Sequence, residues 1–172
     1  MKSAKRFALA AVAAVTLLVF AGCYTTTLNL GKAVDAKVDV QYCGDWHFTW
    51  ADKDGQSKSA DLIVRNFDNR QYFVEWKEAG ESKPTRYSGF LVPVKDATFA
   101  QLTDLGDKGE PSDTHCILRV QLAGEKLTLR HLNEDFFKDI KTDAQLRAKV
   151  EANLENAAMY AETASGALVS QP

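Results

Sequence analysis

Alternation of apolar and polar side chains runs through most of this chain and restricts it to a strand-built fold. Trp46, Phe48 and Trp50 fall at every second position, with polar residues such as Asp45 and Thr49 between them. Successive side chains of a strand point to opposite faces, so this spacing gives one apolar face and one polar face. The period recurs, and it predicts seven strands, over about residues 45–50, 62–64, 72–76, 87–94, 98–105, 116–122 and 127–131.

Short turn sequences between these runs indicate how the strands connect. Asp54-Gly55, Asp68-Asn69 and Gly124 stand between alternating segments and suit tight turns. Strands joined in this way form an antiparallel meander, which must close or be covered to remove its edges. We therefore predict a mainly β fold in which the meander closes to a barrel of seven or eight strands.

The period changes toward the C-terminus. Thr142 and Gln145 have the spacing of a capping box, and Leu146, Val150 and Leu154 follow at intervals of four residues. This pattern predicts an amphipathic helix over about residues 142–162, lying against the outside or the open end of the barrel. Residues 165–172 are predicted to be a disordered tail.

The N-terminal segment resembles a bacterial lipoprotein signal peptide. It consists of a basic start with Lys2, Lys5 and Arg6, the uncharged residues 7–21, and a small residue, Gly22, before Cys23. The uncharged run of 15 residues is shorter than the about 20 residues of a membrane-spanning helix. The resemblance implies cleavage of residues 1–22 and lipidation of the Cys23 thiol. An ordinary signal peptide cut near Gly22, which would leave a soluble periplasmic protein, is the alternative.

Cleavage would leave one domain of ordinary size. The remaining 150 residues hold 18 Lys+Arg against 23 Asp+Glu, a formal charge of −5. Because the charges are interspersed and no basic cluster occurs, the composition argues against a nucleic-acid partner. We expect a lipid-anchored tether over residues 23–38 and the barrel with its helix over residues 39–164. Tyr24, in place of Asp after the cysteine, points to the outer membrane, with the protein facing the periplasm.

The other two cysteines form an even pair in an oxidising compartment. Cys43 and Cys116 are 73 positions apart, and a disulfide closing such a loop would stabilise the fold by about 4 kcal/mol in the chain-entropy description. A disulfide is our expectation, and two buried free thiols are the alternative.

The start of the first predicted strand is similar to that of lipocalin-like barrels. Gly44-Asp45-Trp46 matches the short GxW pattern of that group. The resemblance implies that Trp46 plugs the closed end of the barrel and that a late basic residue packs across its ring. Arg130 stands near the corresponding place, and a cation over an indole contributes about 0.5–2 kcal/mol.

Five aromatic residues on the predicted strand faces form the candidate ligand-binding set. They are Trp46, Phe48, Trp50, Tyr72 and Trp76. Such a set either lines a cavity or simply fills the core, since a small barrel can be packed by its own side chains or can hold one small ligand.

The sequence points to neither metal chemistry nor a reaction. The three histidines, His47, His115 and His131, are not predicted to converge, and the Asp52-x-Asp54-Gly55 turn lacks the distal Glu of a calcium loop. No nucleophile elbow, phosphate-binding loop or zinc-protease motif occurs. We therefore expect no catalytic residue, no cofactor and no metal.

The sequence predicts a non-enzymatic, membrane-anchored binding module of the cell envelope. Its ligand would be a small apolar molecule or a lipid. The alternative is a protein-binding envelope factor, such as a hydrolase inhibitor or an assembly lipoprotein. That alternative requires a protruding loop, for which residues 78–86 and 106–113 are the candidates.

Overall fold

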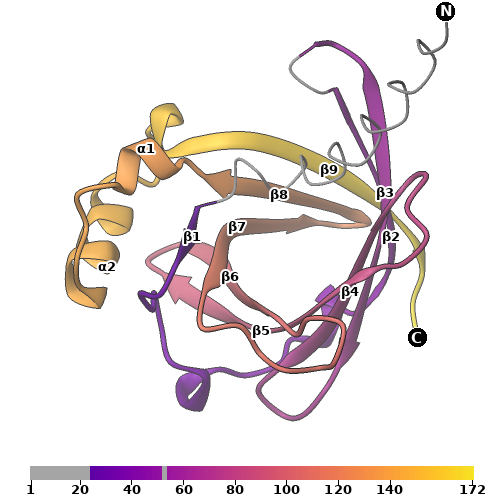
Figure 1. Cartoon of the computed structure of the whole chain (residues 1–172), viewed down its shortest axis with the longest axis horizontal. Coiled ribbons are helices and arrows are strands. Elements are labelled where there is room, and N and C mark those ends of the chain that lie inside the picture. The colour runs from indigo at the N-terminus through magenta and orange to yellow at the C-terminus, as the bar shows by residue number, and fades with distance from the viewer. Residues whose placement is uncertain (1–23, 52–53) are drawn as a thin grey trace, which may run out of the picture.

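The computed structural model describes residues 24–51 and 54–172, and it confirms the antiparallel barrel (Figure 1). Each strand pairs with its neighbours in sequence, and the last strand pairs with the first barrel strand, so that eight strands form a closed ring. The barrel strands are β2 (Gly44–Ala51), β3 (Ser57–Asn66), β4 (Tyr72–Glu78), β5 (Thr85–Val94), β6 (Ala97–Asp104), β7 (His115–Ala123), β8 (Lys126–Leu132) and β9 (Tyr160–Ser170).

The C-terminal residues close the barrel, which corrects two predictions. Helix α2 (Asp143–Ala152) is shorter than the expected 142–162, and the expected tail lies largely within β9. Without β9, strands β2 and β8 would expose unpaired backbone groups, so pairing outweighs the weak alternation of this small-residue segment. Gly166 contributes to the fit, because a Cβ there would collide with the Phe48 ring.

The predicted start of α2 is confirmed. The Thr142 hydroxyl accepts a hydrogen bond from the Gln145 backbone N–H at 3.2 Å, as an N-cap should. The Gln145 side chain accepts a return bond from the backbone of Lys141 at 3.0 Å. Between β8 and β9 the chain also forms α1 (Glu134–Phe137) and a 3-10 turn, η3 (Ala157–Met159).

Residues 24–38 are not a free tether. The short strand β1 (Thr25–Thr26) pairs with the start of β7, and the Tyr24 backbone N–H donates to the carbonyl of Leu132 at 3.2 Å. Leu30 is buried, with an exposed fraction of 2%. This segment is docked because strands β5–β7 carry apolar residues on their outer face as well, and that surface requires cover.

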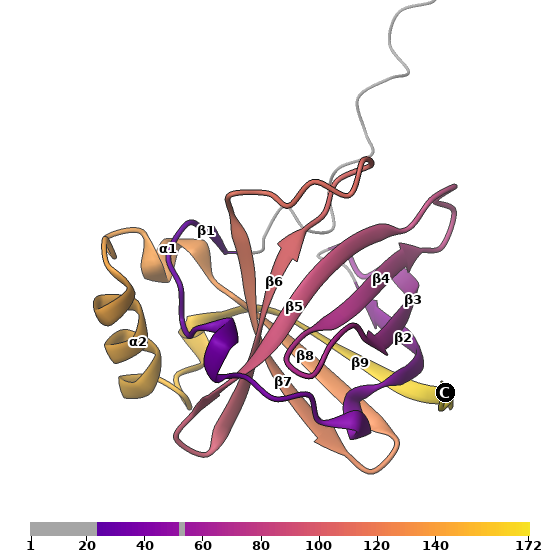
Figure 2. The same ribbon diagram turned by 90° about the horizontal axis from the view of Figure 1, so that it is seen from below.

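The apolar residues therefore form two separate cores. The first, the interior core, lies inside the barrel and includes Trp46, Phe48, Val74, Leu118 and Leu129. The second, the outer core, lies between the outer face of β5–β8 and the segment and helices that cover it. Its most deeply buried members are Val94, Phe99, Ile117, Leu132, Leu146, Val150 and Met159. Figure 2 shows α1, α2 and β1 together on this side of the barrel.

The two ends of the barrel differ in what lies across them. At one end, which we call the plug end, residues 38–43 precede β2 and include the 3-10 turn η2 (Val40–Tyr42), a short distance after η1 (Ala33–Asp35). The β3–β4 turn lies at the same end, where the Val38 N–H donates to the Asn69 carbonyl at 3.3 Å. The opposite end, the loop end, carries the connections 79–84 and 105–114.

Candidate functional site

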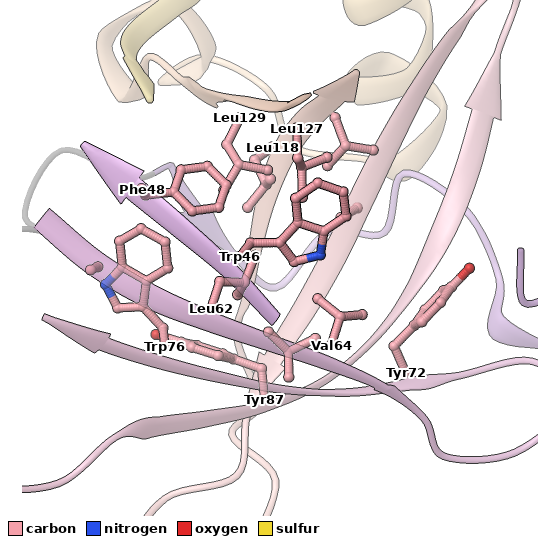
Figure 3. Close-up of a cluster of buried hydrophobic side chains, with 14 of the residues drawn as sticks. Trp46, Phe48, Leu62, Val64, Tyr72, Trp76, Tyr87, Leu118, Leu127 and Leu129 are labelled. Atoms are coloured by element: carbon pink, nitrogen blue, oxygen red, sulfur yellow. The ribbon is translucent and has the colours of Figure 1, made fainter. Parts of the chain in front are cut away.

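An apolar cavity of about 80 Å³ lies in the barrel interior, bounded by strands β3–β8 and the plug end. Figure 3 shows its wall residues on opposite strands pointing toward one another, among them Leu62, Val64, Leu118 and Leu129. A cavity needs roughly 10–15 Å³ to hold one water, so this cavity has room for a slender group several times that size. Its further lining includes Tyr42, Val74, Tyr87, Ala100, Val120 and His131.

Of the five aromatic residues predicted to bind a ligand, some line the cavity and the others pack behind or beside its wall. Tyr72 and Trp76 line the cavity. Trp46 and Phe48 are almost fully buried in the interior core without lining it, and Phe48 packs against Trp76 with ring centroids 5.5 Å apart. Trp50 is half-buried at the end of β2 and packs against Trp76 at 5.8 Å. Phe48, Trp76 and Trp50 thus form one aromatic cluster that extends from the cavity wall to the loop end.

Two tyrosines join the cavity to the plug end. The Tyr72 hydroxyl accepts a hydrogen bond from the Asp39 backbone N–H at 2.6 Å and donates to the Asp39 carbonyl at 3.1 Å. Burial raises the pKa of Tyr72 to about 12. Burial also raises the pKa of Tyr42, whose hydroxyl bonds the side chain of Thr98 on β6. These bonds hold residues 38–43 across the barrel end.

The role expected for Trp46 and Arg130 is only partly present. Trp46 does lie next to the plug, where its indole N–H donates to the Tyr42 carbonyl at 3.2 Å. Arg130, however, lies 5.6 Å from the ring centroid of Tyr160 and not over Trp46. Leu129 and His131 point inward on β8, so Arg130 between them points outward, and the barrel wall separates it from Trp46.

Gly44 has a packing role at the first strand. A Cβ at this position would lie 2.7 Å from the Leu168 side chain and 3.0 Å from the carbonyl of Ser170. The glycine therefore lets the end of β9 approach the start of β2. On the outer face next to it, the Asp45 carboxylate bonds Arg65 at 2.6 Å and Ser170 at 2.8 Å, and the bond to Arg65 is the main cause that lowers the pKa of Asp45.

No disulfide joins Cys43 and Cys116, contrary to our expectation. Both thiols are buried in the interior core, and burial raises the pKa of Cys43. Strands β2 and β7 run in opposite directions around the barrel. Cys43 precedes β2 at the plug end, whereas Cys116 lies near the start of β7 at the loop end, so the meander keeps the two thiols apart.

The three histidines lie in separate environments. His47 is exposed on the outer face, where it contacts the Asp61 carboxylate at 2.8 Å. His115 contacts the Thr103 hydroxyl at 2.9 Å, and burial lowers its pKa. His131 lines the cavity. Across the described ranges, no three His, Cys, Asp or Glu side chains are grouped to hold a metal ion. Asp52 of the calcium-like turn is outside the described residues.

The two loops considered for protein binding come together at the loop end. The Leu105 backbone N–H donates to the Arg86 carbonyl at 2.9 Å and joins their bases. Between them lies a polar groove of about 500 Å³. Its charged lining consists of Lys83, Arg86, Asp104 and Asp107. Arg86 also bonds Glu75 of β4 at 2.8 Å, which fixes its guanidinium at the edge of the groove.

Several lining residues were missed by sequence reasoning. The inward positions of β6–β8, such as Ala100, Leu118 and Leu129, were recognisable as strand faces from their alternation, but alternation does not show which strands face one another. Tyr42 lies before the first strand in a segment without a period, and no sequence signal marks it as part of the plug.

Comparisons with protein-family models, curated proteins and solved structures found no match to this chain. Among residues 24–51 and 54–172, no helix is long and apolar enough to cross a membrane.

Proposed function

We propose that this protein is a lipid-anchored lipoprotein of the cell envelope whose barrel binds a small apolar ligand or part of a lipid. The observation that carries the proposal is the apolar cavity of about 80 Å³ in the barrel interior. Apolar cavities of this kind stay dry and favour apolar guests, because a water inside them would lack hydrogen-bond partners.

The lining indicates the chemistry of the ligand. Leucine, valine and aromatic side chains supply most of the wall, and among the lining residues only His131 carries an imidazole. No carboxylate, lysine or arginine is part of that lining, so a charged group would remain unpaired inside the barrel at high cost. The favoured ligand is a narrow hydrocarbon, such as the end of an acyl chain, whose polar group stays outside.

In this proposal the barrel binds its ligand and does not catalyse a reaction. The polar groups of the lining side chains are tyrosine hydroxyls, one imidazole and the Trp76 indole N–H, and Tyr72 is already bonded to the backbone of the plug. The lining includes no serine, threonine, cysteine or lysine, the side chains that most often form covalent intermediates.

The anchor in this proposal is the lipid on Cys23, which lies outside the described residues. Support comes from the basic start, the uncharged run and the small residue before the cysteine. Mass spectrometry of the exported protein should find acyl groups on Cys23, and C23A should leave the membrane fraction. Recovery of C23A with the membranes at the normal level would contradict the anchor.

A cavity-filling variant tests ligand binding. Ala100 lines the cavity, and A100L would place extra methyl and methylene groups in it. Fatty acids of increasing length should bind the mature protein and be released on denaturation in native mass spectrometry, whereas A100L should lose this binding. Ala167 is exposed on β9, so A167L makes the same change at a surface position and should bind normally. Equal binding by A100L and the parent would place the ligand elsewhere.

The second candidate function is protein binding at the polar groove, because the two separate loops of the sequence form one surface there. As an inhibitor of an envelope hydrolase, the protein would lose inhibition when the groove charge is reversed in K83E. A100L would keep inhibition, since its change is internal. Assays of both variants against a peptidoglycan hydrolase therefore separate the two candidate functions.

A further inference from the structure

We infer that a lipid on Cys23 would hold the loop end of the barrel directly against the bilayer surface, with no tether between them. This inference rests on the anchor of the proposed function and adds an interaction surface and an orientation to it. The partner is a lipid bilayer, and the surface consists of the loop end together with the region around Tyr24.

The first support is the fixed position of Tyr24. Its side chain has an exposed fraction of 6%, and its ring packs on Phe137 of α1 with centroids 5.1 Å apart. Its backbone N–H is bonded to the Leu132 carbonyl. The peptide that joins Cys23 to Tyr24 therefore begins at a fixed point of the barrel wall, and consecutive Cα atoms are only about 3.8 Å apart.

The second support is the end of the barrel at which this point lies. Leu132 is the last residue of β8, and Thr26 pairs with His115, the first residue of β7. Both strand ends face the connection 105–114 and not the plug. Figure 2 shows β1 beside the end of this connection, where the chain enters β7, and across the barrel from residues 38–43.

The segment that follows Tyr24 cannot serve as a spacer, because it is held along its length. The Gln101 side chain is 1% exposed; it accepts from the Leu30 N–H at 2.9 Å and donates to the Asn29 side chain at 2.8 Å. The Asn29 N–H donates to Asp143 of α2 at 2.9 Å, and Arg147 donates to the Leu30 carbonyl at 3.3 Å.

The thickness of the membrane interface completes the argument. Each polar headgroup region is about 5–8 Å deep, and acyl chains on Cys23 must start at its inner boundary. A tether of one peptide bond is too short to raise the barrel above this region, so the surface around Tyr24 lies among the headgroups. Half-buried Trp50 at the same end is suited to this depth, since tryptophan favours membrane interfaces.

Energy transfer from two matched sites to labelled lipids tests the orientation. Lys108 is exposed at the loop end and Arg70 at the plug end, so K108C and R70C each replace one exposed cation by a reactive thiol. Because Cys43 and Cys116 are buried, a fluorescent maleimide should label mainly the introduced residue, and the unsubstituted lipoprotein measures the background. The full lipidated chain is reconstituted into phosphatidylcholine vesicles that contain an acceptor-labelled lipid.

We expect higher transfer from residue 108 than from residue 70. A flexible Gly/Ser insertion of about ten residues between Cys23 and Tyr24, which reaches roughly 17 Å on average, should abolish the difference. Equal transfer from both sites, or higher transfer from residue 70, in a protein that is lipidated and vesicle-bound would overturn the orientation and leave the anchor intact. An unlipidated Cys23 with no vesicle binding would overturn the anchor, and the orientation with it.

Discussion

The interior core and the outer core are built from the same kinds of side chain, but the apolar cavity lies in the interior core. In the outer core, Phe99, Ile117, Leu146, Val150 and Met159 all have an exposed fraction of 0%, and helix α2 fits closely over the strands. In the interior, residues on facing strands leave a cavity between Tyr72, Leu118 and Leu129. The difference teaches that the outer core packs tightly over one side of the barrel wall, whereas the interior keeps a void.

The two cores also differ in their polar side chains, because the outer core includes groups that are held by hydrogen bonds. The outer core includes a buried amide, Gln101, whose hydrogen bonds fix residues 29 and 30. Arg119 reaches from β7 to the Leu154 carbonyl at 2.9 Å and ties the end of the helical region to the barrel. Hydrogen bonds of this kind specify position, because each buried group must find its partner. The cavity wall is mostly apolar, so under the proposed function it would select a guest by shape and apolarity.

The largest expected effect compares one leucine from each core. L146A in the outer core should lower the free energy of unfolding by about 2–5 kcal/mol, since it removes a side chain packed on all sides. L118A should cost less, because Leu118 already faces the cavity and has fewer atoms in contact on that side. Denaturant unfolding of both variants measures the difference. Equal losses of unfolding free energy in the two variants would show that Leu118 is packed as tightly as Leu146 despite the cavity.

A smaller effect is expected from the buried amide. Q101A leaves the Leu30 N–H without its acceptor and should cost about 1–3 kcal/mol. The damage should be local, with faster hydrogen exchange at residues 24–30 and unchanged exchange in β3 and β4. As a control, Q121A changes an exposed glutamine of the neighbouring strand. Uniformly faster exchange over the whole barrel in Q101A would mean that the segment does not act as a separate cover.

The smallest effect concerns pH and the plug. Folding raises the pKa of Tyr72 from 10.0 to about 12, so its contribution is complete below pH 10 and is lost as the pH rises toward 12. Melting temperatures of the parent and Y72F should therefore converge over this range, with Y72F the less stable below it, because it lacks the two bonds to Asp39. A constant difference up to pH 12 would contradict this role.

Local patterns were sufficient to predict the seven central strands and the start of α2, because each carries its own period or cap. The closing strand β9 could not be predicted in this way, since residues 160–170 are mostly small and gain their structure from the edges of β2 and β8. The docking of residues 24–30 depends on the outer face of β6 and β7, which no local pattern of that segment reveals. The alternation along β8 places Arg130 on the face opposite Leu129, so its outward position could have been predicted. The resemblance to lipocalin-like barrels implied instead that Arg130 packs across Trp46.

Only a small part of the candidate site was predictable, for a related reason. Tyr72 and Trp76 were identified because they lie on the apolar face of a strand. Their cavity arises from the combined register of six strands, β3–β8, and from Tyr42 in the plug. That arrangement is a property of the closed barrel and not of any one segment.

The position of β9 also determines when the barrel can form. Phe48 on the first barrel strand pairs with Gly166 of β9. If the chain is exported N-terminus first, as the proposed anchor implies, one edge of β2 stays exposed until β9 has followed. Long-range pairing of this kind folds slowly, and exposed edges promote aggregation. An exported chain with this topology would therefore depend on periplasmic holdase chaperones during the interval before its last strand arrives.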